Sequence, residues 1–459
     1  MRSGRLIALV LFVVAVLVAG CSEESNPPEP TTGDWHGKIE IPGSPLELGV
    51  TFKDDGTATI DIPVQGISAA QLKDVKSDRD GVEWAIADIP GDPKFKGRYD
   101  SGADKIAGDF TQSGQSFPLS LQRGKVAPLP RPQEPKPPFP YQSEDVSYRN
   151  GELTIAGTLT KPQGDGPFPA VLLITGSGPQ DRNEELMGHK PFLLLADTLT
   201  RAGYAVLRAD DRGVGGTGGK LDDANYDDLT ADAAAGVNFL RGRAEIDKTR
   251  IGLLGHSEGG YLAPQVAARP DSGVAFVILM AGPSVSGRDV LIEQNRVLLG
   301  AAGESPESIE KQVRFVAEWS QLLSSGDVAG AKAVQRRHNE TVPPEQRQPE
   351  AALDALNTRY MGSFLGYDPA PALSALRVPV FAFFGSKDLQ VPPSQSEQPM
   401  RDRLAANPDA TVQTFPGLNH LMQPAQTGQP SEYTTIETTI APEVLTSVTN
   451  WLTQRFPPK

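Results

Sequence analysis

The chain has 459 residues, and its 43 Lys and Arg against 57 Asp and Glu give a net charge of −14. This acidic balance argues against nucleic acid or an anionic membrane surface as a partner. The length allows two or three domains, and a hydrophobic fraction of 38% suffices for globular cores.

Residues 1–20 are typical of a bacterial secretion signal. Two arginines precede an apolar run from Leu6 to Ala19 that is too short to cross a bilayer. Val18 to Cys21 (V-A-G-C) resembles the lipobox, which implies a diacylglyceryl group on Cys21, cleavage before it, and N-acylation by a fatty acid such as palmitate. We therefore expect an extracytoplasmic lipoprotein on the cell or outer membrane, the alternative being a cytosolic protein with a structural Cys21. Cys21 is the only cysteine, so disulfides and cysteine metal sites are not expected.

An antiparallel β domain is predicted for residues 33–124, after a polar tether at residues 21–32. Apolar residues alternate along 46–52 and are followed by Asp54-Asp55-Gly56, which is typical of a strand and a hairpin turn. Further strands are predicted at 57–62, 82–86, 95–99, 105–111 and 117–121. From G-D-W-H-G onward the region resembles the lipocalin-like domain that precedes some secreted α/β hydrolases. Two interpretations remain, a ligand-binding module and a folded spacer.

The remainder of the chain has an α/β pattern. Residues 125–140 are proline-rich and predict an extended, semi-rigid linker. Residues 141–459 open with a hairpin around Asn150-Gly151 and then alternate apolar strands with helical stretches, which indicates a mostly parallel sheet covered by helices on both faces. The predicted strands are 170–175, 205–209, 251–254, 274–280, 378–384 and 411–415, with a helix at 227–243.

A candidate nucleophile follows the apolar strand 251–254. Gly255-His256-Ser257-Glu258-Gly259 is a G-x-S-x-G elbow, which places a serine on a strained turn between a strand and a helix. A side chain at either flanking glycine would collide with the neighbouring strand or helix as the backbone reverses. Ser257 is therefore the predicted nucleophile.

A serine hydroxyl needs an imidazole that takes its proton, and the imidazole needs an acid that orients it. Only His338 and His420 follow Ser257, and His338 lies in a polar, helix-like run. His420, just after strand 411–415, is the predicted base. Asp388 follows the apolar strand 378–384 directly and is the predicted acid.

The negatively charged oxygen of the reaction intermediate needs two hydrogen-bond donors. One is expected to be the backbone amide of Glu258, the residue after the nucleophile. The other should come from the loop after strand 170–175, where we predict the amide of Ser177, with Gly178 as second choice.

These motifs together resemble the α/β-hydrolase superfamily. They are T-G-S-G-P-Q-D-R-N-E at 175–184, D-D-R-G-V-G-G-T at 210–217, G-H-S-E-G-G, G-S-K-D and L-N-H. Within the superfamily they resemble bacterial secreted esterases described as serine aminopeptidase-like or prolyl-oligopeptidase-like. The resemblance covers about residues 144–456 and implies Ser257, Asp388 and His420 as the triad, with Ser177 and Glu258 as oxyanion donors.

Other polar residues near these motifs allow two interpretations. Gln180, Asp181 and Arg182 could bind substrate or brace their loop. Asp210 to Arg212 precede Ser257, and the resemblance implies an architectural Arg-carboxylate pair there. His256 is predicted to be a packed, hydrogen-bonded residue.

Residues 283–376 are predicted to form a helical insertion, with helices at 307–323, 327–338 and 350–364. At this position α/β hydrolases carry a lid, which sets substrate size and excludes water. Trp319 and Tyr360, with Met361 and Phe364, could line the substrate pocket. The alternative is that they form the core of the insertion itself.

The sequence thus predicts a serine hydrolase that cleaves carboxylic esters of small or medium acyl groups, without a metal or an organic cofactor. An aminopeptidase or amidase is the main alternative, and it would need a carboxylate such as Glu293, Glu304 or Glu318 to pair with a peptide ammonium group. A thioesterase is a further possibility. A surface ligand-binding protein with degenerate hydrolase activity is another, although such a protein has no need of a complete triad.

Overall fold

The computed structural model describes residues 31–42, 44–78, 81–87, 89, 91–344 and 347–458. The predicted signal and Cys21 lie outside these residues. The chain forms two compact units that divide between Pro130 and Arg131, and each has its own core. Within the described residues, no helix combines the length and the apolar character needed to span a membrane.

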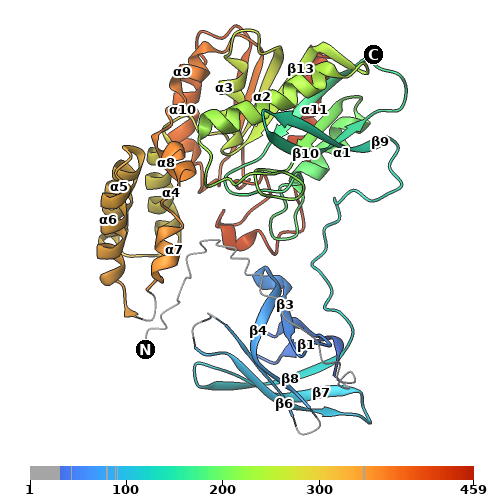
Figure 1. Ribbon diagram of the computed structural model, residues 1–459, viewed down its shortest axis with the longest axis vertical. Helices are drawn as coiled ribbons and strands as arrows, with labels where there is room; N and C mark the ends of the chain where they lie inside the picture. The colour runs from blue at the N-terminus through green and yellow to red at the C-terminus, as the bar shows by residue number, and fades with distance from the viewer. Residues whose placement is uncertain are drawn as a thin grey trace. The chain divides into compact units, whose positions relative to one another are not determined.

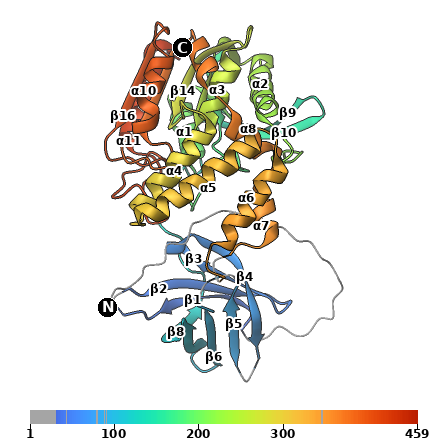
Figure 2. The same cartoon turned by 90° about the vertical axis from the view of Figure 1, so that its left-hand side faces the viewer.

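The first unit is a closed barrel of eight antiparallel strands in sequential order, in which β1 pairs with β8 (Figure 2). The strands are β1 (Gly33–Ile39), β2 (Leu46–Phe52), β3 (Ala58–Ile62), β4 (Ile67–Ser77), β5 (Val82–Ile86), β6 (Lys94–Asp100), β7 (Lys105–Gln112) and β8 (Gln115–Arg123), with a 3₁₀ turn η1 (Pro63–Gln65). The predicted strands are all present, but β1 and β4 were not predicted. β4 gives little signal because Leu72 is its one fully buried residue.

Large apolar side chains fill the interior of the barrel. Trp35, Trp84 and Phe95 are fully buried there, and the rings of Trp84 and Phe95 stack with centroids 5.2 Å apart. A barrel of eight strands is just wide enough for side chains to fill. Of the two interpretations of this unit, the packed interior favours the folded spacer.

The second half of the proline-rich segment is attached to the second unit, which begins at Arg131 and is called the catalytic unit because it contains the predicted triad. The guanidinium of Arg131 donates to the carbonyl oxygens of Met187 and Thr434, both at 2.8 Å. The Gln133 amide donates to the carbonyl oxygen of Ile440 at 2.8 Å, and Glu134 forms an ion pair with a lysine of this unit. The linker predicted at residues 125–140 therefore ends before Arg131 in the structure.

The catalytic unit is built on an eight-stranded sheet in the order β16-β15-β14-β13-β11-β12-β10-β9 (Figure 1). Its strands are β9 (Gln142–Asn150), β10 (Leu153–Lys161), β11 (Phe168–Ile174), β12 (Ala205–Ala209), β13 (Ile246–His256), β14 (Val274–Met280), β15 (Val380–Gly385) and β16 (Ala410–Phe415). β9 and β10 form the predicted hairpin at Asn150-Gly151, and β10 pairs antiparallel with β12. The other neighbours are parallel, so the predicted fold class is confirmed.

Helices cover both faces of this sheet because its central strands are apolar on both sides. On β13, Leu253 packs into the core beneath one helical layer and Leu254 into the core beneath the other. The first layer contains α2 (Tyr226–Gly242), α3 (Gly259–Ala267), α9 (Ala370–Ala375) and α10 (Pro393–Arg403), and the second contains α1 (Pro191–Arg201) and α11 (Pro442–Arg455). A short 3₁₀ turn, η3 (Pro430–Glu432), precedes α11.

The helical insertion lies between β14 and β15, as predicted (Figure 2). It comprises α4 (Gly287–Ala301), α5 (Pro306–Ser324), α6 (Val328–Glu340), α7 (Glu350–Asp354) and α8 (Arg359–Gly366). The prediction of one helix at 350–364 was wrong, and α4 was not predicted. The helix is interrupted because Asn357 folds its amide back onto the Leu353 carbonyl at 2.9 Å, and Thr358 then caps α8 by accepting from the Met361 amide at 3.1 Å.

Replacing Trp35 by alanine should destabilise the barrel by about 3–5 kcal/mol, as for other buried Trp to Ala changes. The ring is fully buried, and the Arg123 guanidinium stacks on it 4.0 Å from the centroid. Hydrogen exchange of the barrel amides in the full chain measures the loss. Val64→Ala, at a side chain that is 39% exposed, is the control. Equal protection in the two variants would contradict a barrel held together by its interior.

Candidate active site

Three predicted catalytic residues converge at one edge of the sheet. Ser257 follows β13, Asp388 follows β15 and His420 follows β16, and these strands are parallel members of one sheet. The carboxyl ends of parallel strands share an edge, which is where α/β proteins bind their ligands. The fold therefore brings together residues that are up to 163 positions apart in the sequence.

The turn at Ser257 has the strained geometry of a nucleophile elbow. Ser257 has φ +52°, in the left-handed region that non-glycine residues rarely occupy. A methyl group at Gly255 would lie 2.1 Å from the carbonyl oxygen of Gly259, and one at Gly259 would lie 2.2 Å from that of Ile174. No side chain fits at either position, which is the physical reason predicted for these glycines.

His420 and Asp388 form a buried hydrogen-bonded pair. Nδ1 of His420 lies 2.8 Å from Oδ2 of Asp388. The other carboxylate oxygen accepts from the amides of Gln390 and Val391, both at 2.8 Å. Because a carboxylate accepts the proton on Nδ1, the neutral imidazole presents the lone pair of Nε2.

His420 lies beside the nucleophile elbow. Its ring centroid is 4.9 Å from that of His256, the residue before Ser257. In the described part of the chain, neither the Ser257 hydroxyl nor Nε2 of His420 has a hydrogen-bond partner. Catalytic hydrogen bonds often tighten only when substrate binds, so this arrangement leaves both atoms available for reaction.

The loop after β11 presents one free amide between two that are bound. The Gly176 amide donates to Oε1 of Glu184 at 2.6 Å, and the Gly178 amide donates to the hydroxyl of Tyr360 at 3.1 Å. Among the residues described here, no group accepts from the amides of Ser177 or Glu258, the two predicted oxyanion donors. Gly178, the second choice, is occupied by Tyr360.

His256 links the loop after β11 to the loop that carries His420. Its Nδ1 lies 2.9 Å from Oε1 of Glu184, and its Nε2 lies 3.2 Å from the carbonyl oxygen of His420. Both partners are acceptors, so both contacts are hydrogen bonds at once only when the imidazole is protonated on both nitrogens. Burial alone would lower the pKa of His256, but the charge and hydrogen bond of Glu184 raise it above the ordinary value. The prediction of a packed, hydrogen-bonded His256 is confirmed, whereas the role of Glu184 was missed.

The side chain of Glu258 is buried between two tyrosines. Tyr226 on α2 donates to Oε1 at 2.6 Å, and Tyr360 on α8 donates to Oε2 at 2.5 Å. Burial raises the pKa of Glu258 to about 7, against the opposite effect of the two hydroxyls. Glu258 thus combines a backbone amide, for which the described residues offer no acceptor, with a carboxyl group fixed by two tyrosines. Sequence analysis did not predict Tyr226.

Ion pairs and hydrogen bonds brace the neighbouring loops. Arg182 donates to both oxygens of Asp210, at 3.0 and 2.6 Å. Asp211 accepts from the Thr175 hydroxyl and the Gln180 amide, both at 2.9 Å, and burial raises the pKa of Asp211 well above its ordinary value. These contacts favour the architectural interpretation of both motifs. The Gln180 side chain is exposed and donates to the Ser177 carbonyl at 3.1 Å.

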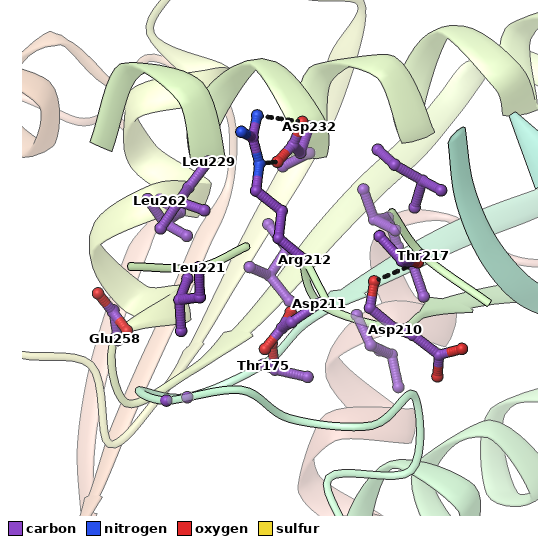
Figure 3. A pocket seen from close by; sticks show the side chains of 18 of the residues that line it. Thr175, Asp210, Asp211, Arg212, Thr217, Leu221, Leu229, Asp232, Glu258 and Leu262 are labelled. Carbon is purple, nitrogen blue, oxygen red and sulfur yellow. Dashed lines mark hydrogen bonds and ion pairs between the residues drawn. The ribbon is translucent and has the colours of Figure 1, made fainter. Parts of the chain in front are cut away.

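A cavity of about 70 Å³ lies behind the loop after β11 (Figure 3). Gly176, Gly178, Asp211 and Glu258 line it, together with the ion pair of Arg212 and Asp232. None of the three predicted catalytic residues lines it. The cavity therefore borders the loop after β11 and the Glu258 side chain, and is separate from the three predicted catalytic residues.

The structure places Trp319 and Tyr360, both predicted for the substrate pocket, in different surroundings. Trp319 is buried in the core of the insertion with Leu323, Val334 and Leu365, and its Nε1 donates to Asn357 at 3.1 Å. It therefore fits the alternative of a lid core. Tyr360 contacts the supports of the predicted oxyanion site instead.

The chain is similar to several known proteins. Residues 171–432 match the profile of the alpha/beta hydrolase family. Esterase EstD of Thermotoga maritima is 28% identical over 311 residues, which cover 66% of this chain and 67% of EstD. The putative hydrolase YtaP of Bacillus subtilis is 30% identical over 139 residues, covering 27% of this chain and 46% of YtaP. The Pyrococcus furiosus esterase Pf2001 superposes with a TM-score of 0.44 and 15% identity, covering 72% of this chain and 99% of that one.

The chain is thus a hydrolase and belongs to the alpha/beta hydrolase family. In the part of the chain that the structure describes, no cluster of three or more His, Cys, Asp or Glu side chains has an arrangement that could hold a metal ion.

Glu258→Gln should change how stability depends on pH. The pKa of Glu258 is about 7 in the folded chain and ordinarily 4.5. The folded state therefore binds this proton more tightly than the unfolded state does. The contribution of this proton to the free energy of unfolding is fully present below pH 4.5 and is lost as the pH rises to 7. The loss is about 3 kcal/mol, since one pKa unit corresponds to about 1.4 kcal/mol.

Denaturant unfolding at about pH 4.5 and about pH 8 measures this loss. As the pH rises from about 4.5 to about 8, the free energy of unfolding of Glu258→Gln should increase by about 3 kcal/mol relative to that of the wild type. Glu443→Gln, at an exposed carboxyl group, should show no such change. A Glu258→Gln variant that keeps the wild-type pH dependence would contradict the raised pKa.

Proposed function

We propose that the protein is a serine hydrolase that cleaves carboxylic esters through an acyl-enzyme on Ser257. The observation that carries the proposal is the buried His420–Asp388 hydrogen bond of 2.8 Å at the edge of the sheet where Ser257 occupies its left-handed turn. The similarity to EstD supports an ester substrate.

In the proposed mechanism, Nε2 of His420 takes the proton of the Ser257 hydroxyl while Oγ attacks the ester carbonyl carbon. The resulting oxyanion accepts hydrogen bonds from the amides of Ser177 and Glu258. The tetrahedral intermediate collapses, its bond to the alcohol oxygen breaks, and His420 returns the proton to the departing alcohol. A water molecule then gives a proton to Nε2 of His420 and attacks the acyl carbon. The bond to Oγ breaks, His420 returns the proton to Oγ, and the carboxylic acid leaves with Ser257 restored.

We further propose that the helical insertion acts as a lid that limits the substrate to small or medium acyl groups. Both ends of α4 are tied to the body of the catalytic unit. Gln395 donates to the carbonyl oxygen of Asp289 at 2.9 Å, and Gln429 donates to that of Ala301 at 2.8 Å. A helix held at both ends confines a pocket more strictly than a free flap.

The insertion glutamates give little support to an aminopeptidase. Glu318 forms an ion pair with Arg337 at 2.7 Å, and Glu293 forms one with Arg296 at 3.4 Å. A carboxylate that is already paired attracts a peptide ammonium group less strongly. The ester therefore remains the proposed substrate.

Ser257→Ala should lower kcat for p-nitrophenyl esters by about 10⁴- to 10⁶-fold, because the variant has no nucleophile and retains only binding and oxyanion stabilisation. The assay uses the chain from Ser22 onward and acyl groups from acetate to palmitate, beside a panel of amino-acid p-nitroanilides. We expect ester turnover to fall with increasing acyl length and anilides to remain uncleaved.

Three results would contradict this proposal. Ester turnover that survives in Ser257→Ala would overturn the assignment of the nucleophile. Anilide turnover that exceeds ester turnover would instead indicate a peptidase. Ligand binding by the barrel, with no turnover of any ester, would favour a binding protein.

We also propose that Cys21 carries lipid and holds the protein at a bacterial membrane, on the basis of the V-A-G-C sequence at residues 18–21. Cys21→Ser should abolish labelling by radioactive palmitate and move the protein from the membrane pellet to the soluble fraction, since stable attachment needs more than one acyl chain. Ser22→Ala is the control and should stay labelled. Label retained in Cys21→Ser would exclude this attachment.

A further inference from the structure

The hydroxyl of Tyr360 is fully used by two partners near the reaction centre. It donates its single proton to Oε2 of Glu258 at 2.5 Å and accepts from the amide of Gly178 at 3.1 Å. With its proton already donated, this hydroxyl has none left for a substrate oxygen. Any effect of Tyr360 on the reaction must therefore act through the groups that it holds.

Those two groups adjoin the two predicted oxyanion donors in the chain. Gly178 follows Ser177 directly, and the amide on the other side, that of Gly176, is bound to Glu184 at 2.6 Å. The Ser177 amide thus lies between two fixed amides. The backbone of Glu258 supplies the second donor, and its carboxyl group is the other partner of Tyr360. One hydroxyl therefore joins the loop after β11 to the nucleophile elbow.

Tyr360 belongs to the insertion, and its helix is fixed to the body of the catalytic unit. The Tyr360 amide donates to the carbonyl oxygen of Asp222 at 3.3 Å, and Arg359 donates to that of Asp223 at 3.2 Å. The Tyr360 side chain is only 6% exposed. The hydroxyl is thus supplied by a helix that is firmly attached and largely shielded from water.

We propose that Tyr360 is a positioning residue of the oxyanion site, and that its hydroxyl sets the distance between the Ser177 and Glu258 amides by holding Gly178 and the Glu258 carboxyl group together. The inference rests on the proposed function, because it needs an oxyanion at these amides. It gives the insertion a second role beside that of the proposed lid, in which α8 supports the proposed reaction centre.

Removing this hydroxyl should weaken transition-state stabilisation. Tyr360→Phe keeps the ring but leaves a buried amide and a buried carboxylate oxygen each short of one hydrogen bond. The Gly178 end of the loop can then move. Complete loss of one oxyanion donor costs about 10²- to 10³-fold in kcat, so we expect a displaced donor to cost about 10- to 100-fold.

The test compares three tyrosine variants in the full chain. Tyr360→Phe should lower kcat on p-nitrophenyl butyrate by about 10- to 100-fold, leave KM nearly unchanged, and weaken inhibition by a trifluoromethyl ketone by a similar factor. Tyr226→Phe removes a hydrogen bond from the same carboxyl group without touching Gly178, and should cost only about threefold. Tyr367→Phe, whose hydroxyl contacts the Tyr261 carbonyl at 3.4 Å, should behave like wild type.

Equal losses in Tyr360→Phe and Tyr226→Phe would overturn the proposal, because the effect would then come from the carboxyl group alone. So would a Tyr360→Phe variant with wild-type kcat. If Tyr360→Phe does not fold, the same change can be made in Glu258→Gln, where the side chain that Tyr360 contacts is an uncharged amide. A further loss of about tenfold in the double variant relative to Glu258→Gln would support the proposal, and no further loss would overturn it. Failure of the proposed function would show separately, as wild-type protein whose ester turnover does not depend on Ser257.

Discussion

The sharp reversal of the backbone at Ser257 is the constraint on which the proposed reaction centre depends. It requires a left-handed serine and glycines at 255 and 259, where any side chain would meet a carbonyl oxygen at close to 2 Å. The strain of this turn is held by the parallel sheet on one side and α3 on the other, since the Ser257 amide donates to the Met280 carbonyl on the adjacent strand at 2.9 Å. In the next residue, Glu258, the backbone amide has no acceptor among the described residues, whereas the carboxyl group accepts from Tyr226 and Tyr360.

The second feature of the site is the number of ionisable side chains that the fold buries behind it. Glu184, His256 and Glu258 are each at most 5% exposed, and Asp211 is partly buried. Burying a charge costs several kcal/mol unless it is paired, so each of these groups must find partners. Glu184 and Asp211 accept hydrogen bonds from the loop after β11, and Glu258 accepts them from tyrosines on α2 and α8. The contacts that offset the cost of burial therefore also fix this loop and these helices in place.

Sequence patterns predict the reaction centre better than its supports. The elbow at Ser257 and the positions of Asp388 and His420 follow from local signals, an apolar strand ending in a polar or glycine-rich turn. The partners of Glu258 do not follow from local signals. Tyr226 and Tyr360 lie 32 and 102 residues away and contact Glu258 only in the packed structure of the sheet and the insertion. The break between α7 and α8 was missed for a related reason, since the helical periodicity continues across Asn357 and only side-chain hydrogen bonds end the helix.

The two tyrosines that hold Glu258 come from different parts of the fold, and this difference bears on how the enzyme could diverge. Tyr226 is the first residue of α2, a helix that packs on the sheet, whereas Tyr360 lies in α8, a helix of the insertion. An insertion that only covered a pocket could change freely with the substrate. One that also fixes the Gly178 amide could not, because a shift of α8 by one helical turn, about 5.4 Å, would remove the hydroxyl from both of its partners. Changes in substrate size should therefore be easier to accommodate in α4 to α6 than at α8.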